Sequence, residues 1–140
     1  MYLALGNTEA QVITVEGNVQ LVKIASDSFS TAGLQNITII NSRFDDVMPR
    51  LVSSIRGNVL IFIDGNHTFE ATIRYFNLFR DIPGNSIILI LDDINWSRNM
   101  RLAWKKIKNS HGAGLKIDMY HMGILFKIAG LSEQNLQICY

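Results

Sequence analysis

The stretch Val59-Leu60-Ile61-Phe62-Ile63-Asp64 is apolar, rich in β-branched side chains, and ends on an acid. A second run of the same kind, SIILILD, occupies residues 86–92. Strands that are buried on both faces, as in a parallel sheet covered by helices, have this composition. The two runs therefore predict neighbouring strands of a parallel sheet.

Two further apolar runs, at residues 11–16 and 36–41, predict two more strands upstream. Apolar residues recur at helical spacing between the strands, and Pro83-Gly84 is expected to end one of these helical segments. The helices are expected over residues 19–32, 46–55, 68–80 and 97–109. Strands that alternate with helices indicate right-handed βαβ crossovers and an α/β fold with helices on both faces of the sheet.

The C-terminal part departs from this alternation. Residues 116–121 alternate polar and apolar, Met122-Gly123 is expected to turn, and residues 124–128 are apolar again. This pattern predicts an antiparallel pair of strands at the sheet edge. The sequence shows no internal repeat and no linker, so residues 1–140 are expected to form a single domain.

Composition excludes several classes of protein. The chain has 140 residues, 48% hydrophobic, with a formal net charge of +1, so no strong field points to nucleic acid or to an anionic membrane. The single cysteine, Cys139, excludes an internal disulfide framework and a Cys-rich zinc site, and fits a reducing cytoplasm. No apolar run approaches the length of a membrane helix, and residues 1–7 lack the features of a signal peptide.

In open parallel sheets, ligands bind beyond the carboxyl ends of the strands. Acids recur at these positions: Glu16 ends the first strand, Asp64 the third, and Asp92 and Asp93 the fourth. Glu16 could accept hydrogen bonds from ribose hydroxyls, although taken alone it is more simply a solvated acid or a helix cap. Asp64, Asp92 and Asp93 could hold Mg²⁺ or a similar cation, or could instead cap turns and helices.

Other residues near this edge could also take part. His67 follows Asp64 by three positions and could act as a general base, or could merely begin the next helix. Trp96 and Phe44 are expected in loops, where either could stack on a purine or an aromatic substrate, or could instead cover the core. His111 and His121 are interpreted as structural or surface residues. The basic stretch at residues 98–116 is interpreted as a solvated helix face, with RNA binding as the second reading.

With these residues in place, the chain resembles the class I S-adenosylmethionine-dependent methyltransferases. It is most similar to small-molecule O-methyltransferases of the catechol and caffeoyl-coenzyme A type and their bacterial relatives. The resemblance rests on residues 12–16, 38–51, 62–67, 91–96 and 122–126. It implies a Rossmann-like sheet, S-adenosylmethionine as cofactor, and Mg²⁺ as a possible second cofactor.

The resemblance also implies roles for individual residues. Glu16 would hold the ribose and Gly17 would be a further cofactor-binding residue, while Asp64 would contact both the cofactor and the metal. The candidates beside the adenine are Arg43, Phe44 and Asp45. His67 and Asp64 would be the catalytic residues, with Asp64, Asp92 and Asp93 as the metal ligands. His67 stands where the family often has lysine, and Asp93 where it often has asparagine; neither change forbids a metal or base catalysis.

One part of the family pattern is missing. Nothing before Gln11 resembles the family's first strand and its Gly-rich cofactor loop, and residues 1–5 resemble the end of the helix that follows that loop. The chain is therefore expected to be a truncated domain without its central strand. The strands of Glu16 and Asp64 could pair directly, a second chain could fill the gap, or the sheet could repack, and a homo-oligomer is the favoured outcome.

These features predict methyl transfer to a hydroxyl oxygen of a small-molecule acceptor, impaired by the missing strand. The alternative is a non-catalytic α/β module that binds a nucleotide-like ligand or a partner chain. The expected partners are a small methyl acceptor and a second copy of the chain, with no nucleic acid and no membrane, in the cytoplasm.

Overall fold

The computed structural model describes residues 1–82 and 86–138, and the chain divides into two compact units, Met1–Arg50 and Leu51–Tyr140. Helix α3 (Phe44–Ser54) runs through the division between them. Pro83-Gly84, expected to end a helical segment, and Cys139, the single cysteine, lie outside the described residues. The single domain expected over residues 1–140 stays a prediction.

The first unit is a parallel strand pair with its crossover helix. Strand β1 (Val12–Glu16) pairs with β2 (Ile37–Asn41), in a register that runs from Val12 opposite Ile37 to Glu16 opposite Asn41. Helix α2 (Val19–Thr31) connects the two strands, and the Asn18 side chain caps it by accepting from the backbone N–H of Gln20. The expected strand–helix–strand order is confirmed, with each boundary within one residue.

Asn36 fastens the N-terminal segment of this unit. Its Nδ2 donates to the carbonyl oxygens of Ala4, Asn7 and Ala10 at 2.9–3.2 Å. Helix α1 (Tyr2–Gly6) and the turn after it are therefore tied to the start of β2 by one side chain. Apolar burial contributes less here, because α2 has no buried residue and Tyr2 and Ile24 are 81% and 61% exposed.

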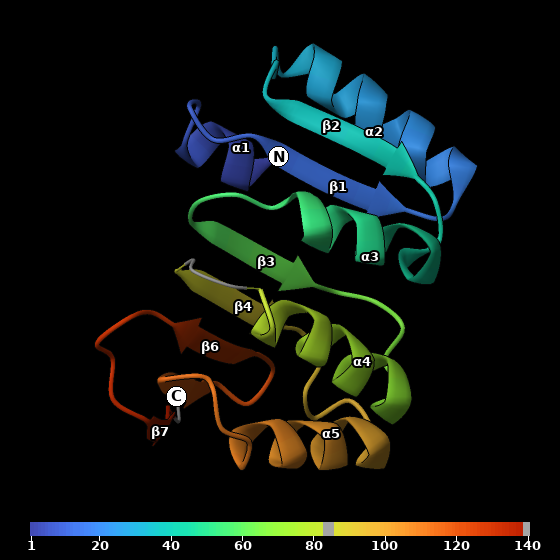
Figure 1. Ribbon diagram of the computed structural model, residues 1–140. Helices are drawn as coiled ribbons and strands as arrows, with labels where there is room; N and C mark the ends of the chain where they lie inside the picture. Colours follow the sequence, from blue (N-terminus) through green and yellow to red (C-terminus); the bar gives the residue numbers. More distant parts are fainter. Residues whose placement is uncertain (83–85, 139–140) are drawn as a thin grey trace. The chain divides into compact units, whose positions relative to one another are not determined.

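The second unit is built on a mixed five-stranded sheet with the order β3-β4-β6-β5-β7. Strands β3 (Val59–Ile63) and β4 (Ile87–Leu91) are parallel, as the two apolar runs predict. Strands β5 (Leu115–Asp118) and β6 (Gly123–Lys127) form the expected antiparallel pair. The fold is thus an α/β fold of the Rossmann-like class, with a mixed sheet and helices (Figure 1).

The antiparallel pair is not at the sheet edge, which corrects one expectation. Strand β7 (Gln134–Gln137) pairs in parallel with β5 and forms the outer strand. Its four residues are all exposed and lack an apolar alternation, so the sequence pattern does not reveal the strand. Gly123 is likewise a strand residue rather than part of the turn, which spans residues 119–122.

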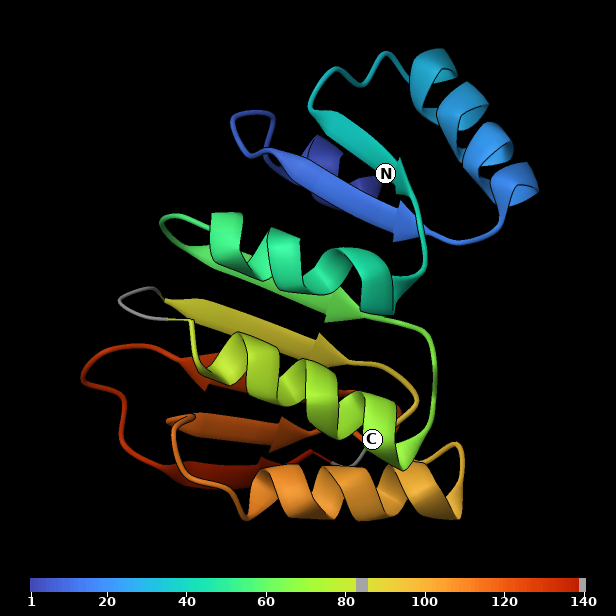
Figure 2. The same ribbon diagram turned by 45° about the vertical axis from the view of Figure 1, so that its right-hand side comes forward.

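Helices α4 (Phe69–Arg80) and α5 (Arg98–Lys108) lie side by side over one face of this sheet (Figures 1 and 2). Thr68 caps α4 and Ser97 caps α5, each through its side-chain oxygen. Thr72 of α4 contacts the sulfur of Met100 of α5 at 3.3 Å. The core between helices and sheet includes Tyr75, Phe76, Phe79, Leu89, Leu91, Ile94, Trp104, Ile107 and Leu125.

The opposite face of this sheet remains partly open. Leu60 and Phe62 of β3 are 45% and 46% exposed. The parallel register places them beside Ile88 and Ile90 rather than on the face that carries Leu89. Helices α4 and α5 therefore cover only one face of the sheet in this unit.

Strands β1 and β3 belong to different sheets. Among the described residues, β1 pairs only with β2 and β3 only with β4. The three expected outcomes for the strands that carry Glu16 and Asp64 stay predictions.

Asp118 clamps α5 onto the hairpin of β5 and β6. Its Oδ2 accepts from Trp104 Nε1 at 2.8 Å and from Lys108 Nζ at 2.7 Å, and its Oδ1 accepts from the backbone N–H of Tyr120. Burial by itself would raise the pKa of Asp118, but the hydrogen bonds from Lys108, Trp104 and Tyr120 outweigh it and hold the pKa below its usual value. The carboxylate is therefore ionised near neutral pH, and both of its oxygens accept hydrogen bonds.

Within the described parts of the chain, every helix is too short or too polar to cross a lipid bilayer.

Candidate functional site

The carboxyl ends of β3 and β4 bring three predicted residues together. Ile63 lies opposite Leu91 in the register, and the backbone N–H of Asp92 donates to the carbonyl of Ile63 at 3.0 Å. The loops after the two strands therefore start side by side. They place Asp64, His67 and Asp93 at one point of this edge.

His67 stands between the two carboxylates. Its Nε2 lies 3.7 Å from Asp64 Oδ1 and 3.7 Å from Asp93 Oδ2, which is ion-pair distance but too long for a hydrogen bond. All three side chains are partly open to solvent. A proton taken up by His67 would be flanked by two negative groups, so the arrangement suits the removal of a proton from a bound hydroxyl.

The backbone around His67 is held in an uncommon conformation. Asn66 and Asp93 have positive φ angles of 51° and 55°, which Asn and Asp tolerate better than most residues. Asn66 Nδ2 donates to the hydroxyl of Tyr75 in α4, at 3.2 Å. Thr68 then begins α4 by accepting from the backbone N–H of Ala71. His67 is therefore fixed from both sides, by a side-chain anchor and by a helix cap.

The predicted metal ligands do not form a metal site. Asp92 Oδ1 accepts from the backbone N–H of Asp93 at 2.9 Å, which is the capping role weighed as the alternative. The structure shows no group of three or more His, Cys, Asp or Glu arranged to hold a metal ion among residues 1–82 and 86–138. Mg²⁺ thus receives no support from these residues.

The predicted adenosine contacts lie in the first unit, at the carboxyl ends of β1 and β2. Glu16 Oε1 accepts from the backbone N–H of Asn18 at 2.7 Å, so Glu16 caps the turn into α2. The carbonyl of Glu16 accepts from Asn41 Nδ2 and from the backbone N–H of Ser42. Gly17 lies in the same turn, with Ser42 O 3.7 Å from the position its Cβ would take.

Arg43, Phe44 and Asp45 follow β2 at the same edge as Glu16. Arg43 and Asp45 are exposed, and Phe44 is half-buried. Helix α3 begins at Phe44 rather than at Asp46, so Phe44 stands in a helical turn and not in the expected loop. The first unit thus presents an acid, a guanidinium and an aromatic ring at one edge of its strand pair.

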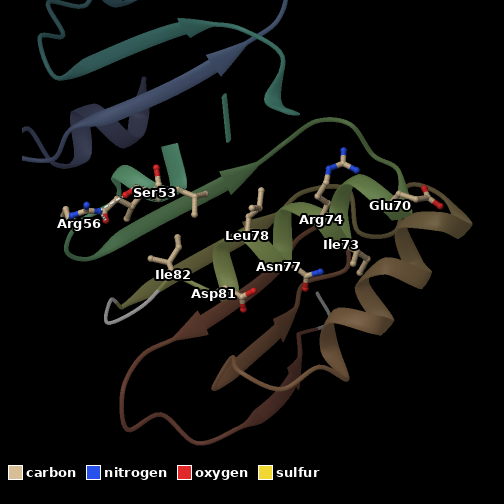
Figure 3. A pocket seen from close by; sticks show the side chains of 11 residues that line it. Ser53, Arg56, Glu70, Ile73, Arg74, Asn77, Leu78, Asp81 and Ile82 are labelled. Atoms are coloured by element: carbon tan, nitrogen blue, oxygen red, sulfur yellow. Dashed lines mark hydrogen bonds between the residues drawn. The ribbon is translucent and has the colours of Figure 1, made fainter. Parts of the chain in front are cut away.

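A hollow in the second unit lies elsewhere (Figure 3). It has a volume of about 940 Å³ and runs between the end of α3 and the length of α4. Leu78 and Ile82 give it an apolar floor, while Arg56 and Asp81, at its rim, already bind neighbouring groups. None of the predicted site residues lines it.

The loop between β5 and β6 was not among the predicted site residues. It lies at the same edge of the sheet as the loop that carries His67. The β5–β6 loop contains Tyr120, which is 64% exposed and has a positive φ of 66°. A two-residue hairpin loop normally contains Gly or Asn, which adopt a positive φ easily. Residues 119–122 are MYHM and contain neither, so a hairpin at this place predicts an unusual backbone conformation. His121, interpreted as structural or surface, is exposed and packs edge-on against the Tyr120 ring.

Comparison with models of protein families gives a match. A family model described as a methyltransferase domain matches residues 1–94. The matched region runs from α1 through β4 and contains all the predicted site residues. A search of curated proteins finds no match for the chain.

Proposed function

The chain belongs to the methyltransferase domain family, and on that premise we propose that it transfers a methyl group from S-adenosylmethionine to a hydroxyl oxygen of a small molecule. The family implies S-adenosylmethionine as the methyl donor. The hydroxyl oxygen and the small acceptor are parts of the proposal that rest on the resemblance described above.

The observation that carries this proposal is the position of His67 between Asp64 and Asp93. The cofactor, when bound, supplies a methyl group made electrophilic by its sulfonium. His67 Nε2 would take the proton of the acceptor hydroxyl as that oxygen is methylated. The carboxylates of Asp64 and Asp93 would stabilise the imidazolium that forms.

The residues proposed to hold the cofactor have suitable chemistry. A carboxylate has two oxygens, so Glu16 can accept from the Asn18 N–H and still accept from ribose hydroxyls. Gly17 leaves room for the ribose beside the backbone. Phe44 offers a ring face for adenine, with Arg43 and Asp45 beside it. Asp64 would contact the cofactor where the methyl group is transferred.

Calorimetry with S-adenosylmethionine and S-adenosylhomocysteine tests the proposal. Binding near micromolar Kd, weakened about tenfold or more in Glu16→Gln by loss of a charged hydrogen-bond acceptor, is the expected result. Glu9→Gln, an exposed acid outside the proposed site, is the matched control and should bind as the parent does. No heat at millimolar ligand would refute a working cofactor site.

The alternative remains a non-catalytic module that binds a nucleotide-like ligand or another chain. Among the described residues of the second unit, β3 pairs with β4 alone, and its Leu60 and Phe62 are half exposed. An edge of this kind can pair with a further strand, which favours the alternative. We also propose, from the sequence, that the chain forms a homo-oligomer and that it is located in the cytoplasm. Light scattering over a range of concentrations tests the homo-oligomer. A monomer mass at every concentration would show that the chain does not bind a second copy of itself.

A further inference from the structure

The contacts of His67 with the two carboxylates are too long to hold its ring in place. Its Nε2 lies 3.7 Å from an oxygen of Asp64 and 3.7 Å from an oxygen of Asp93, beyond hydrogen-bond distance. The ring is also partly open to solvent, so packing encloses it only in part. The place of the imidazole between the carboxylates therefore depends on the backbone that carries it.

The backbone at His67 is closed into a short turn. The N–H of Thr68 donates to the carbonyl of Asn66 at 2.6 Å, so His67 is the central residue of a three-residue turn. Asn66 enters this turn with a φ of 51°. Thr68 leaves it as the cap of α4, by accepting from the backbone N–H of Ala71. The direction of the imidazole thus follows from the position of Asn66 and from that of the first turn of α4.

One side-chain hydrogen bond joins this turn to the core. Asn66 Nδ2 donates to the hydroxyl of Tyr75 at 3.2 Å. Tyr75 stands in the middle of α4 and is 2% exposed, whereas Asn66 is exposed. Tyr75 lies about two helical turns beyond Thr68, and therefore on the same side of α4. The turn is thus held at both ends by one helix, at Thr68 by the cap and at Asn66 by a buried hydroxyl.

The carboxylate of Asp93 has separate supports. Its residue has a φ of 55°, its N–H donates to Asp92 Oδ1, and its carbonyl accepts from the N–H of Trp96. These contacts lie within the loop after β4 and do not involve α4. The 3.7 Å between His67 and Asp93 is therefore the product of two independent supports, and Tyr75 belongs to only one of them.

We infer that Tyr75 is a positioning residue for His67. Its buried hydroxyl holds the Asn66 side chain, and Asn66 in turn sets where the imidazole stands between the two carboxylates. The inference rests on the proposed function in one respect, namely that the imidazole is the base of the reaction. The placement of the ring is a property of the chain without any ligand, and can be measured in that state.

Nuclear magnetic resonance of the unliganded chain tests the placement. The Hε1–Cε1 correlation of His67 is identified by its loss in His67→Gln. Tyr75→Phe keeps a ring in the core and removes the hydroxyl, and is expected to shift this correlation. Thr72→Val is the matched control, because it removes a buried hydroxyl of the same helix that contacts Met100 instead of Asn66. An unshifted His67 correlation in Tyr75→Phe, or an equal shift in Thr72→Val, would overturn the inference.

Asn66→Gly separates the hydrogen bond from the backbone angle. Glycine adopts a positive φ without cost but has no amide to donate to Tyr75. The variant is expected to shift the His67 correlation as Tyr75→Phe does. The double variant should shift it no further, because both substitutions remove one interaction. A normal His67 correlation in Asn66→Gly would show that the angle alone places the ring. Additive shifts would show that the two residues act separately, and would reject the inference equally.

Kinetics extends the test to the reaction, with catechol as the probe acceptor. Tyr75→Phe should lower kcat about tenfold and leave KM for catechol and the Kd of S-adenosylhomocysteine within about twofold, because only the base is displaced. A chain that shows the His67 shift but binds no S-adenosylmethionine would keep the positioning role and reject the proposed function. Methyl transfer at the parent rate in Tyr75→Phe would keep the methyltransferase and reject the positioning role.

Discussion

At the scale of a residue, His67 carries the proposed chemistry and gives the most direct test. If it is the general base, His67→Gln should lower kcat by about 10²- to 10⁴-fold and leave the Kd of S-adenosylhomocysteine almost unchanged. Steady-state kinetics and calorimetry measure the two quantities. His111→Gln is the control, because that ring is 93% exposed and its Nδ1 lies 3.2 Å from Glu133 Oε2, away from the proposed site. Equal activity of the two variants would contradict the assignment.

Gly123 shows how one residue can limit packing. A Cβ there would lie 2.6 Å from Trp104 Cη2 and Cζ3, and a buried indole ring cannot swing aside. We expect Gly123→Ala to lower the free energy of unfolding by about 1–3 kcal/mol, measured by urea denaturation. Gly6→Ala, with no atom within 4 Å of the new methyl group, serves as the control. A Gly123→Ala chain as stable as the control would show that β6 and α5 can separate freely.

The sequence predicts the acids and the histidine at the strand ends because alternation of strand and helix fixes which residues reach that edge. It does not predict which of them meet. Asp92 and Asp93 are adjacent in the chain, yet the positive φ of Asp93 turns one carboxylate toward His67 while the other caps the turn. That choice depends on backbone conformation, which residue type alone does not specify.

At the scale of an element, helix α5 is held by a charge that titrates. The pKa of Asp118 is lowered from 3.8, despite its burial, by hydrogen bonds from Lys108 and Trp104. Its stabilising contribution is therefore full above pH 3.8 and is lost as the pH falls toward the lower pKa of the folded state, because the unfolded chain binds the proton first.

This gives a prediction for the pH dependence of unfolding. Asp118→Asn should be less stable than the parent near neutral pH by about 2–4 kcal/mol, since it leaves Lys108 without its carboxylate partner. Below pH 3.8 the stabilities of parent and variant should converge. Urea denaturation at several pH values measures this, with the exposed Asp27→Asn as control. A constant gap between parent and variant at all pH values would refute the role of Asp118.

Helix ends show what sequence patterns miss at this scale. Lys116 is 4% exposed, and its Nζ donates to the carbonyls of Lys108 and Ser110 at the end of α5. Lys127 does the same for Arg80 and Ile82 at the end of α4. Each lysine, from a neighbouring strand, binds the last carbonyl oxygens of a helix, which have no partner within the helix. From the sequence alone, both lysines would be predicted to be exposed residues of a strand in which polar and apolar residues alternate.

At the scale of the whole molecule, the two units bury very different amounts of apolar surface. Ala4 is the one buried hydrophobic residue of Met1–Arg50, while the remaining ones in the described chain belong to the second unit. Sequence patterns do not predict this contrast, because residues 19–32 have the apolar spacing of a packed helix. Burial requires a partner surface, and for α2 the described structure leaves Val19, Leu21 and Ile24 exposed.

The contrast predicts unequal local stability. Backbone amides of β1 and β2 should exchange with solvent at least about tenfold faster than those of β4 and β6. Hydrogen exchange with mass spectrometry measures this by segment. S-adenosylhomocysteine should slow exchange around Glu16 if the proposed cofactor contacts are correct. Uniform protection across both units would contradict the contrast, and an unchanged first unit with ligand would count against those contacts.

The chain carries two tryptophans in opposite surroundings. Trp104 is enclosed and hydrogen-bonded to Asp118, whereas Trp96 stands in water. Indole emission shifts toward the red as the ring becomes hydrated, so the fluorescence spectrum of the native chain contains a blue component from Trp104 and a red one from Trp96. Acrylamide, which quenches accessible rings, would suppress the red component alone. One emission spectrum therefore reports separately on the packing of Trp104 against Asp118 and on the exposure of Trp96.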